Sequence, residues 1–186
     1  AMLVLFARKQ LHAHEPMLDL ALFSHPAIAA GMIIAVVASG ALAGVELTLA
    51  QELQYVLSKT PFQAGVFMIP IMAAAAIGGP VAGYLSNLFG LRLVASLSLF
   101  VSAIALGFLA ASDFNESGLA VPVLLAVLGS MLSIGLTASS IAIMGSVEAS
   151  KGGAAGSLEA TSYELGTGLG ISLFGVFISA AYRHAI

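Results

Sequence analysis

The sequence predicts an all-α integral membrane protein, and three observations support that fold class. Sixty per cent of the 186 residues are hydrophobic and only 8% are charged, whereas about a quarter of the residues in an ordinary soluble domain are charged. The apolar residues fall in several runs, each close to or above the roughly 20 residues that span a bilayer as a helix. Short polar patches separate these runs. We therefore expect a bundle of about five transmembrane helices, preceded by a helix stub.

Residues 1–26 are expected to form the end of a preceding helix and an interfacial connector. The seven residues before Arg8 would cover only about 10 Å as a helix, which is too short to span a membrane. We interpret them as the cut end of a transmembrane helix; a short native amphipathic N-terminus is the alternative. The apolar residues from Leu18 to Phe23 then suit a segment that lies against the membrane surface.

Residues 27–186 are expected to form the transmembrane bundle. Ser24 suits the N-cap of the first span, with Pro26 in its first turn. The stretch TPFQ, from Thr60 to Gln63, suits a capping box with proline at the first helical position. The five spans are expected at about 27–57, 62–88, 91–111, 119–147 and 153–182.

The basic residues between the spans favour one orientation. Four of them fall on one side and two on the other, which places the side with four in the cytoplasm. The two sets are Arg8, Lys9, Arg92 and Lys151, against Lys59 and Arg183.

Two carboxylates lie in the fifth span. Glu159 falls in the inner third of this span and Glu164 near its middle. A charge there costs about 2.5–3.5 kcal/mol on insertion scales, so these residues are candidates for binding a proton or a substrate. The alternative is an interhelical hydrogen bond without a role in transport. Five residues rotate the two side chains by about 140°, so they belong to separate sites, while Thr161 and Thr167 are placed to hydrogen-bond Glu164.

A third candidate for proton or substrate binding is Glu46, in the outer third of the first span. Apolar residues flank it on both sides, which favours a water-filled cavity over exposure to lipid. Glu52, near the helix end and Lys59, is interpreted instead as a solvated interfacial charge.

Prolines and glycines indicate how the helices bend and pack. Pro70 and Pro80 lie inside the second span, where each removes a backbone donor and favours a kink; a static kink and a moving one are both open. Gly166 and Gly170 form a small-xxx-small pair in the fifth span, which is typical of close packing between helices.

Several function classes find no support in the sequence. No basic cluster exists for nucleic acid, and the absence of cysteine excludes thiolate metal sites and cysteine nucleophiles. His12 and His14, two residues apart on the connector, make a poor metal ligand set. No serine is paired with a histidine inside a span, so an enzyme is not expected, nor is a metal or a cofactor.

Two stretches resemble a known family. The loop GYLSNLFGLR resembles the short cytoplasmic loop motif of the major facilitator superfamily: Gly83, Gly90 and Arg92 match, while Asn87 and Leu88 stand where the fuller motif has Asp-Arg. The resemblance implies a conformational role for this loop.

The combination of LQYVLSKTPFQAGVFMIP with KGGAAGSLEATSYELGTGLGISLFG is similar to the fourteen-helix drug:proton antiporters of that superfamily. The resemblance implies a partial C-terminal bundle whose N-terminal half lies elsewhere, in the bacterial inner membrane. It also implies proton-coupled multidrug efflux of lipophilic cations such as quaternary ammonium biocides, with Glu164 at the acidic position of the penultimate helix. The alternatives are transport of another small solute, or a non-transporting membrane scaffold or remnant.

Overall fold

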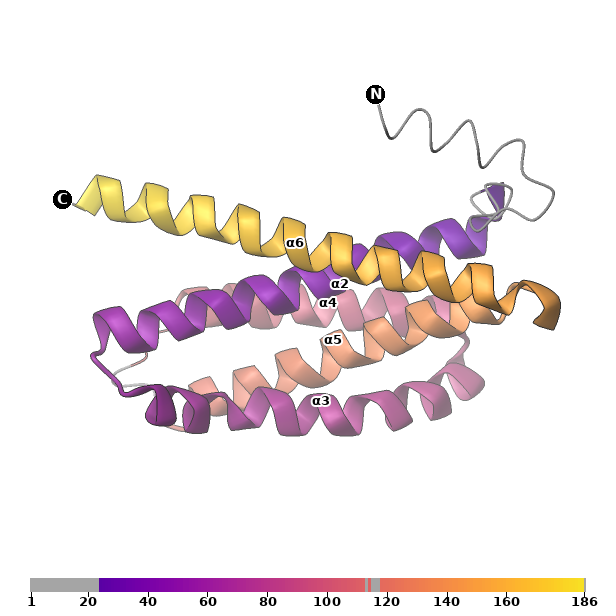
Figure 1. Cartoon of the computed structure of the whole chain (residues 1–186). Helices are drawn as coiled ribbons and strands as arrows, with labels where there is room; N and C mark the ends of the chain where they lie inside the picture. Colours follow the sequence, from indigo (N-terminus) through magenta and orange to yellow (C-terminus); the bar gives the residue numbers. More distant parts are fainter. Residues whose placement is uncertain (1–23, 113, 115–117, 186) are drawn as a thin grey trace, which may run out of the picture.

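The structure, a computed structural model, describes residues 24–112, 114 and 118–185. This part of the chain is all helical, and five of its helices are long and apolar enough to cross a membrane (Figure 1). The predicted fold class is therefore confirmed, while residues 1–23, with the predicted helix stub, lie outside the described residues. The elements are α2 (Pro26–Gln51), the π-helix η2 (Glu52–Val56), α3 (Pro61–Phe89), α4 (Leu91–Ala110), α5 (Ala120–Met144), the 3-10 turn η3 (Ala149–Lys151) and α6 (Gly152–Ala185).

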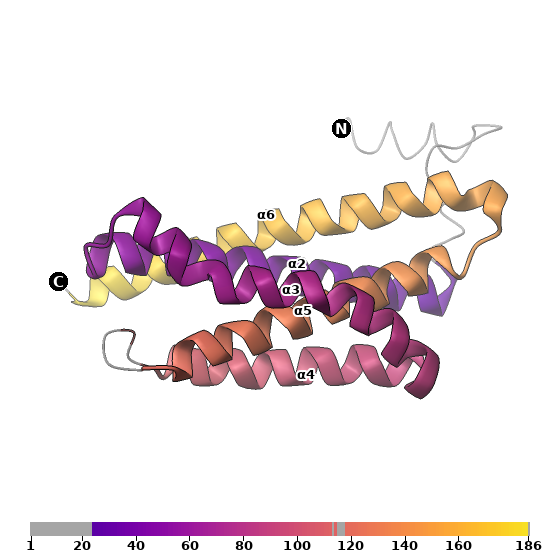
Figure 2. The same ribbon diagram turned by 90° about the horizontal axis from the view of Figure 1, so that it is seen from below.

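Consecutive helices run in opposite directions, so their connections alternate between the two ends of the bundle (Figures 1 and 2). Arg92 and Lys151 lie at the same end as the start of α2, and Lys59 and Arg183 lie at the opposite end. Following the orientation expected from the basic residues, we call these the inner and the outer end.

Proline sets the start of α2, although the N-cap is not the expected residue. Pro26 is in the first turn, and His25 rather than Ser24 is the N-cap, without a hydrogen bond from its side chain. A residue before proline is disfavoured in the helical region, and His25 is extended, with φ −78° and ψ 115°. The helix therefore begins one residue later than an N-cap at Ser24 would require.

The start of α3 confirms the predicted capping box. The Thr60 hydroxyl accepts a hydrogen bond from the Gln63 backbone N–H (3.3 Å), and the Gln63 side-chain oxygen accepts one from the Thr60 backbone N–H (3.1 Å). Pro61 occupies the first turn, where its missing N–H leaves no intrahelical bond unmade. The helix then continues without a break through Pro70 and Pro80.

A single glycine joins α3 to α4. Gly90 has φ +83° and ψ 144°, a backbone conformation open to glycine and strained for residues with a Cβ atom. Its N–H donates to the Ser86 carbonyl and its own carbonyl accepts from Val94, so one residue both ends α3 and begins α4.

The core of the bundle lies around α5, which packs against α3, α4 and α2. Leu125, Leu128 and Leu132 are almost fully buried on this helix. Hydroxyl groups reinforce the contacts: Ser133 donates to the Ala75 carbonyl of α3 (2.7 Å), and Ser139 donates to the Gly31 carbonyl of α2 (2.8 Å). Such interhelical bonds are among the main sources of helix association in lipid, where the hydrophobic effect between helices is absent.

The last helix, α6, packs mainly along α2. The two backbones approach closely because Gly166 and Gly170 lie directly against Gly40: a Cβ atom on Gly40 would lie 2.8 Å from the Gly166 carbonyl oxygen. Nearby, the Ser39 hydroxyl donates to the Tyr163 carbonyl of α6 (3.1 Å). Glycine therefore allows contact here between main chains.

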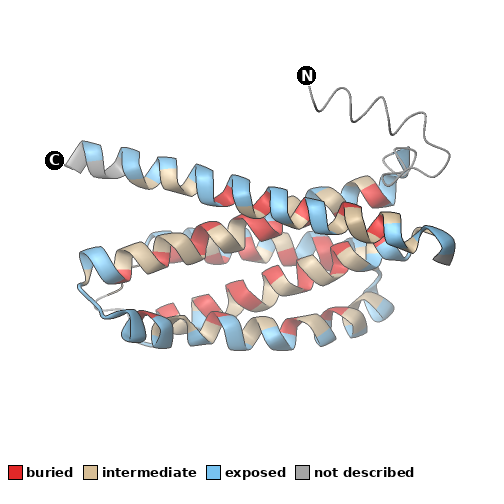
Figure 3. Cartoon of the chain, viewed as in Figure 1, coloured by how far each residue is buried: buried red, intermediate tan, exposed pale blue. Residues whose placement is uncertain are grey.

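The described residues leave most of the surface of two helices uncovered. Only 17% of the apolar window of α3 and 11% of that of α6 are buried, against 44% for α2. Pale blue exposed positions accordingly follow the outer sides of both helices in Figure 3.

Candidate functional site

Glu164 lies on the uncovered side of α6. Ser162 and Gly166, two residues to either side, are buried toward the bundle. Two residues rotate a side chain by about 200° around a helix, so Glu164 points away from them, and it is exposed. The mid-span carboxylate therefore has no covering helix in the part of the chain that the structure describes.

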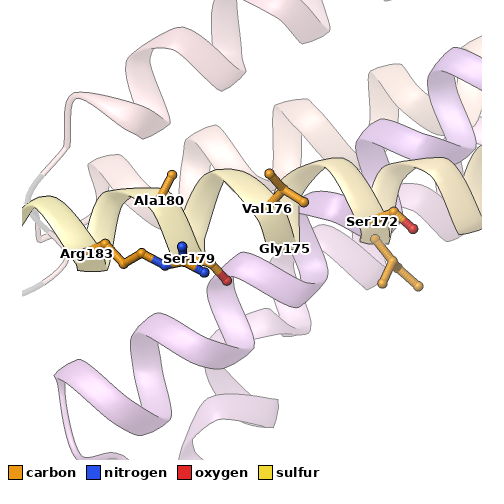
Figure 4. A pocket seen from close by; sticks show the side chains of 7 residues that line it. Ser172, Gly175, Val176, Ser179, Ala180 and Arg183 are labelled. Atoms are coloured by element: carbon orange, nitrogen blue, oxygen red, sulfur yellow. The ribbon is translucent and has the colours of Figure 1, made fainter.

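Small and polar residues continue the same side of α6 toward its outer end. They include Ser172, Gly175 and Ser179, spaced three and four residues apart, and Arg183 follows four residues later. Together with their neighbours they line a shallow hollow of about 640 Å³ (Figure 4). In its outer half, the side of α6 that carries Glu164 thus contains a shallow hollow lined in part by serine hydroxyl groups.

The expected hydrogen bond from Thr161 to Glu164 is absent. The Thr161 hydroxyl donates instead to the Ser157 carbonyl, 2.7 Å away on its own helix. A threonine in a helix readily bonds the carbonyl four residues earlier, which uses its single proton. For Thr167 no described contact joins its hydroxyl to Glu164.

Glu159 occupies a different environment on the same helix. It is half-buried, and the Tyr163 hydroxyl lies 2.8 Å from its Oε1 atom and 3.2 Å from the Leu136 carbonyl of α5. The sequence identified Glu159 as a candidate but not Tyr163. The spacing of four residues, which places the two side chains next to each other on a helix, is the signal that could have found the tyrosine.

Glu46 lies in the outer half of α2 and is half-buried. Among the described residues, no hydrogen bond or ion pair engages its carboxylate. The structure therefore does not bring Glu46 together with Glu159 or Glu164.

Glu52 has a more enclosed position than a solvated interfacial charge. It begins the π-helix η2 and is half-buried. It lines a cavity of about 680 Å³ between α2, α4 and α6, together with Thr48, Phe114 and Phe174. A carboxylate beside aromatic side chains is suited to an organic cation, and π-turns frequently occur at functional positions. The aromatic residues come from distant parts of the sequence, so sequence reasoning could not find this cavity.

Comparison with known proteins identifies the family. No family model matches the chain. The chain is 43% identical over 185 residues to the methyl viologen resistance protein SmvA of Salmonella typhimurium; the match covers all of this chain and 37% of that protein. It is 29% identical over 187 residues to the multidrug efflux pump LfrA of Mycolicibacterium smegmatis, covering 98% of this chain and 36% of the pump. A similar match of 29% joins it to the multidrug resistance protein Stp of Mycobacterium tuberculosis, over 95% of this chain and 33% of that protein.

Over its whole length the chain is homologous to drug efflux pumps of the major facilitator superfamily. It spans about a third of the length of these curated relatives. The relatives are drug efflux and resistance proteins rather than enzymes, and this chain is a multi-pass membrane protein.

The loop that resembles the superfamily motif is built around Gly90. Gly83 lies inside α3, Asn87 is exposed in its last turn, and Arg92 is exposed in the first turn of α4. Among the described residues, no hydrogen bond joins Asn87 to Arg92. The structural requirement that this loop places on its sequence is therefore the positive φ of Gly90.

A metal centre finds no support within residues 24–112, 114 and 118–185, where no three His, Asp or Glu side chains come together in an arrangement that could hold an ion. His12 and His14 lie outside the described residues.

Proposed function

We propose that this chain is part of the C-terminal bundle of a proton-coupled exporter of lipophilic cations, including quaternary ammonium compounds. The observation that carries the proposal is the position of Glu164, an exposed carboxylate in the middle of a membrane span. An ionised carboxylate in contact with hydrocarbon is costly, so its surroundings in the assembled protein must supply water, a proton or a cation.

Competition between a proton and a cationic drug for one carboxylate would couple the proton flux to the drug flux. Glu164 can carry either a proton or the positive charge of a drug, but its single negative charge cannot neutralise both. Loading the proton from outside would release the drug, and losing the proton inside would prepare the site for another. A membrane potential supplies about 2.3 kcal/mol per charge per 100 mV for this exchange.

The proposed partner is the N-terminal half of the same transporter. Alternating access in such folds needs two bundles that rock around a site near the middle of the membrane, and this chain matches about a third of its relatives' length. The uncovered sides of α3 and α6 are available for the other half and for lipid. Within this arrangement we assign Glu46 and Glu159 to supporting charge sites.

The relatives support the substrate class. The Salmonella typhimurium relative at 43% identity is a methyl viologen resistance protein, and methyl viologen is an aromatic dication. A dication gains more binding free energy than a monocation when its site holds two negative charges instead of one. If Glu164 is one of those charges, we expect the export of dications to depend on it most strongly.

The test is the substitution Glu164→Gln in the full-length transporter, with export of methyl viologen measured in inverted vesicles between pH 6 and 8. Glutamine keeps the size and hydrogen bonding of the side chain and removes its charge, so proton-driven export of the dication should be abolished. Export of a monocation such as tetraphenylphosphonium should be weakened. A correctly folded Glu164→Gln variant that exports methyl viologen at the parental rate would refute the role of Glu164.

Glu52→Gln is the comparison variant, because it also removes one carboxylate from a membrane helix, but at the cavity between α2, α4 and α6. If Glu164 holds the cation, Glu52→Gln should reduce methyl viologen export less than Glu164→Gln does. If Glu52→Gln abolished export and Glu164→Gln did not, the cation site would lie in the cavity between α2, α4 and α6.

A further inference from the structure

Tyr163 lies at a junction of three helices. Its backbone carbonyl accepts a hydrogen bond from Ser39 of α2, at 3.1 Å. Its hydroxyl oxygen lies 3.2 Å from the Leu136 carbonyl oxygen of α5 and 2.8 Å from a carboxylate oxygen of Glu159 on α6. A single side chain thus connects the carboxylate of Glu159 to the backbone of α5.

The hydroxyl of Tyr163 has two acceptors but only one proton. When Glu159 is ionised, its charge and the shorter distance favour the bond to the carboxylate, because charge-assisted hydrogen bonds are roughly twice as strong as neutral ones. The phenol oxygen then faces the Leu136 carbonyl without a proton between them.

Protonation of Glu159 removes this conflict. The carboxylic acid donates its proton to the phenol oxygen, and the phenol donates its own proton to the Leu136 carbonyl. Every acceptor in the chain of bonds is then satisfied, and α6 is hydrogen-bonded to α5. Proton occupancy of Glu159 therefore decides whether this bond between the helices forms.

Among the described residues, the helices that pack against α6 place no other charged group beside the junction. Helix α5 carries no titratable residue, and α2 carries only Glu46, two turns outward from Ser39. On the chain that leads into α6, Lys151 of η3 lies about two turns before Glu159. Ser139 of α5 also faces the Tyr163 hydroxyl, but its own proton is directed to the Gly31 carbonyl of α2.

We propose that Glu159 and Tyr163 form a proton-binding site, separate from the cation-binding Glu164, that ties α6 to α5 only while Glu159 is protonated. This proposal rests on the proposed function for its role in transport. Glu164 lies five residues further along the same helix, on its uncovered side. Forming or breaking the tie would shift α6 as a unit, which links a proton on one side of the helix to the cation site on the other.

The test measures the distance between the two helices as a function of pH. The chain contains no cysteine, so spin labels can be attached at cysteines replacing Met144 of α5 and Ala160 of α6, both exposed. In the full-length transporter, otherwise free of reactive cysteines, the distance distribution should contain two populations. We call them tied, with the Tyr163 hydroxyl bonded to the Leu136 carbonyl, and untied, without that bond. Their ratio should change by about threefold, the effect of one interhelical hydrogen bond, between pH 3.5 and pH 9, a range that includes the ordinary titration of a carboxylic acid.

Two conservative substitutions should fix opposite states. Glu159→Gln keeps a donor toward the phenol oxygen, so it should hold the tied population at every pH. Tyr163→Phe removes the link and should hold the untied population at every pH. The double variant, with both Glu159→Gln and Tyr163→Phe, should do the same. The proposal is overturned if the parental distance does not respond to pH, if Tyr163→Phe keeps the parental response, or if Glu159→Gln matches Tyr163→Phe.

Glu164→Gln separates this proposal from the proposed function. The variant should lose methyl viologen export while keeping the pH response of the distance between α5 and α6. Normal export by Glu164→Gln would refute the cation site and leave the distance measurement as an independent test of the proton site. Loss of the pH response in Glu164→Gln would instead overturn the separation of the two sites.

Discussion

Replacing Gly170 with alanine should drive α2 and α6 apart. A Cβ atom at this position would lie 2.6 Å from the Gly40 Cα atom and 2.7 Å from its carbonyl carbon, and closer still to its carbonyl oxygen. Carbon atoms in contact prefer about 3.5–4.0 Å, so the two helices must separate locally by about 1 Å. The obstructing atoms belong to the backbone, so no side chain can rotate away.

The cost of this substitution follows from the contacts it disturbs. Overpacking a well-packed interface by one carbon typically costs about 1–3 kcal/mol. Separation of the helices also lengthens the bond from Ser39 to the Tyr163 carbonyl, now 3.1 Å. We therefore expect Gly170→Ala to lower the free energy of unfolding by about 1–3 kcal/mol relative to a control with equal helix propensity.

Gly168→Ala is that control, because it lies on the same helix and no atom comes within 4 Å of the position that its new methyl group would take. Both substitutions gain about 1 kcal/mol of helix propensity, so their difference reports packing alone. Equilibrium unfolding of the purified protein in mixed micelles, followed by circular dichroism, measures it. If Gly170→Ala proved as stable as Gly168→Ala, the close approach of α2 and α6 would not exist in the folded protein.

Two further predictions concern the loop and the core. Gly90→Ala should destabilise the protein by about 1–3 kcal/mol, because φ +83° is strained for alanine. Gly83→Ala is the control: Gly83 belongs to the same motif but lies in a helix, with no atom within 4 Å of the added methyl group, so this variant should not be destabilised. Equal unfolding free energies for the two variants would contradict this account. Ser139→Ala removes the bond to the Gly31 carbonyl and should cost about 0.6–1.7 kcal/mol. Ser172→Ala is the comparison in the same unfolding assay, because the Ser172 hydroxyl bonds within α6. If Ser139→Ala lost less unfolding free energy than Ser172→Ala, the interhelical bond would add no stability.

The sequence by itself determined the membrane class, the number of long apolar helices in the described residues and the capping box at Thr60, because length, hydropathy and capping are local properties. It also placed Glu159 and Glu164 on different sides of one helix through their five-residue spacing. Tertiary structure alone decided which side is covered: α2 approaches Gly166 and Gly170, so Glu164 is left open. It also joined Tyr163 to Leu136 on α5 and gathered Glu52, Phe114 and Phe174 around one cavity. These contacts join residues far apart in the chain, and the periodicity of a single helix carries no information about which neighbour it meets.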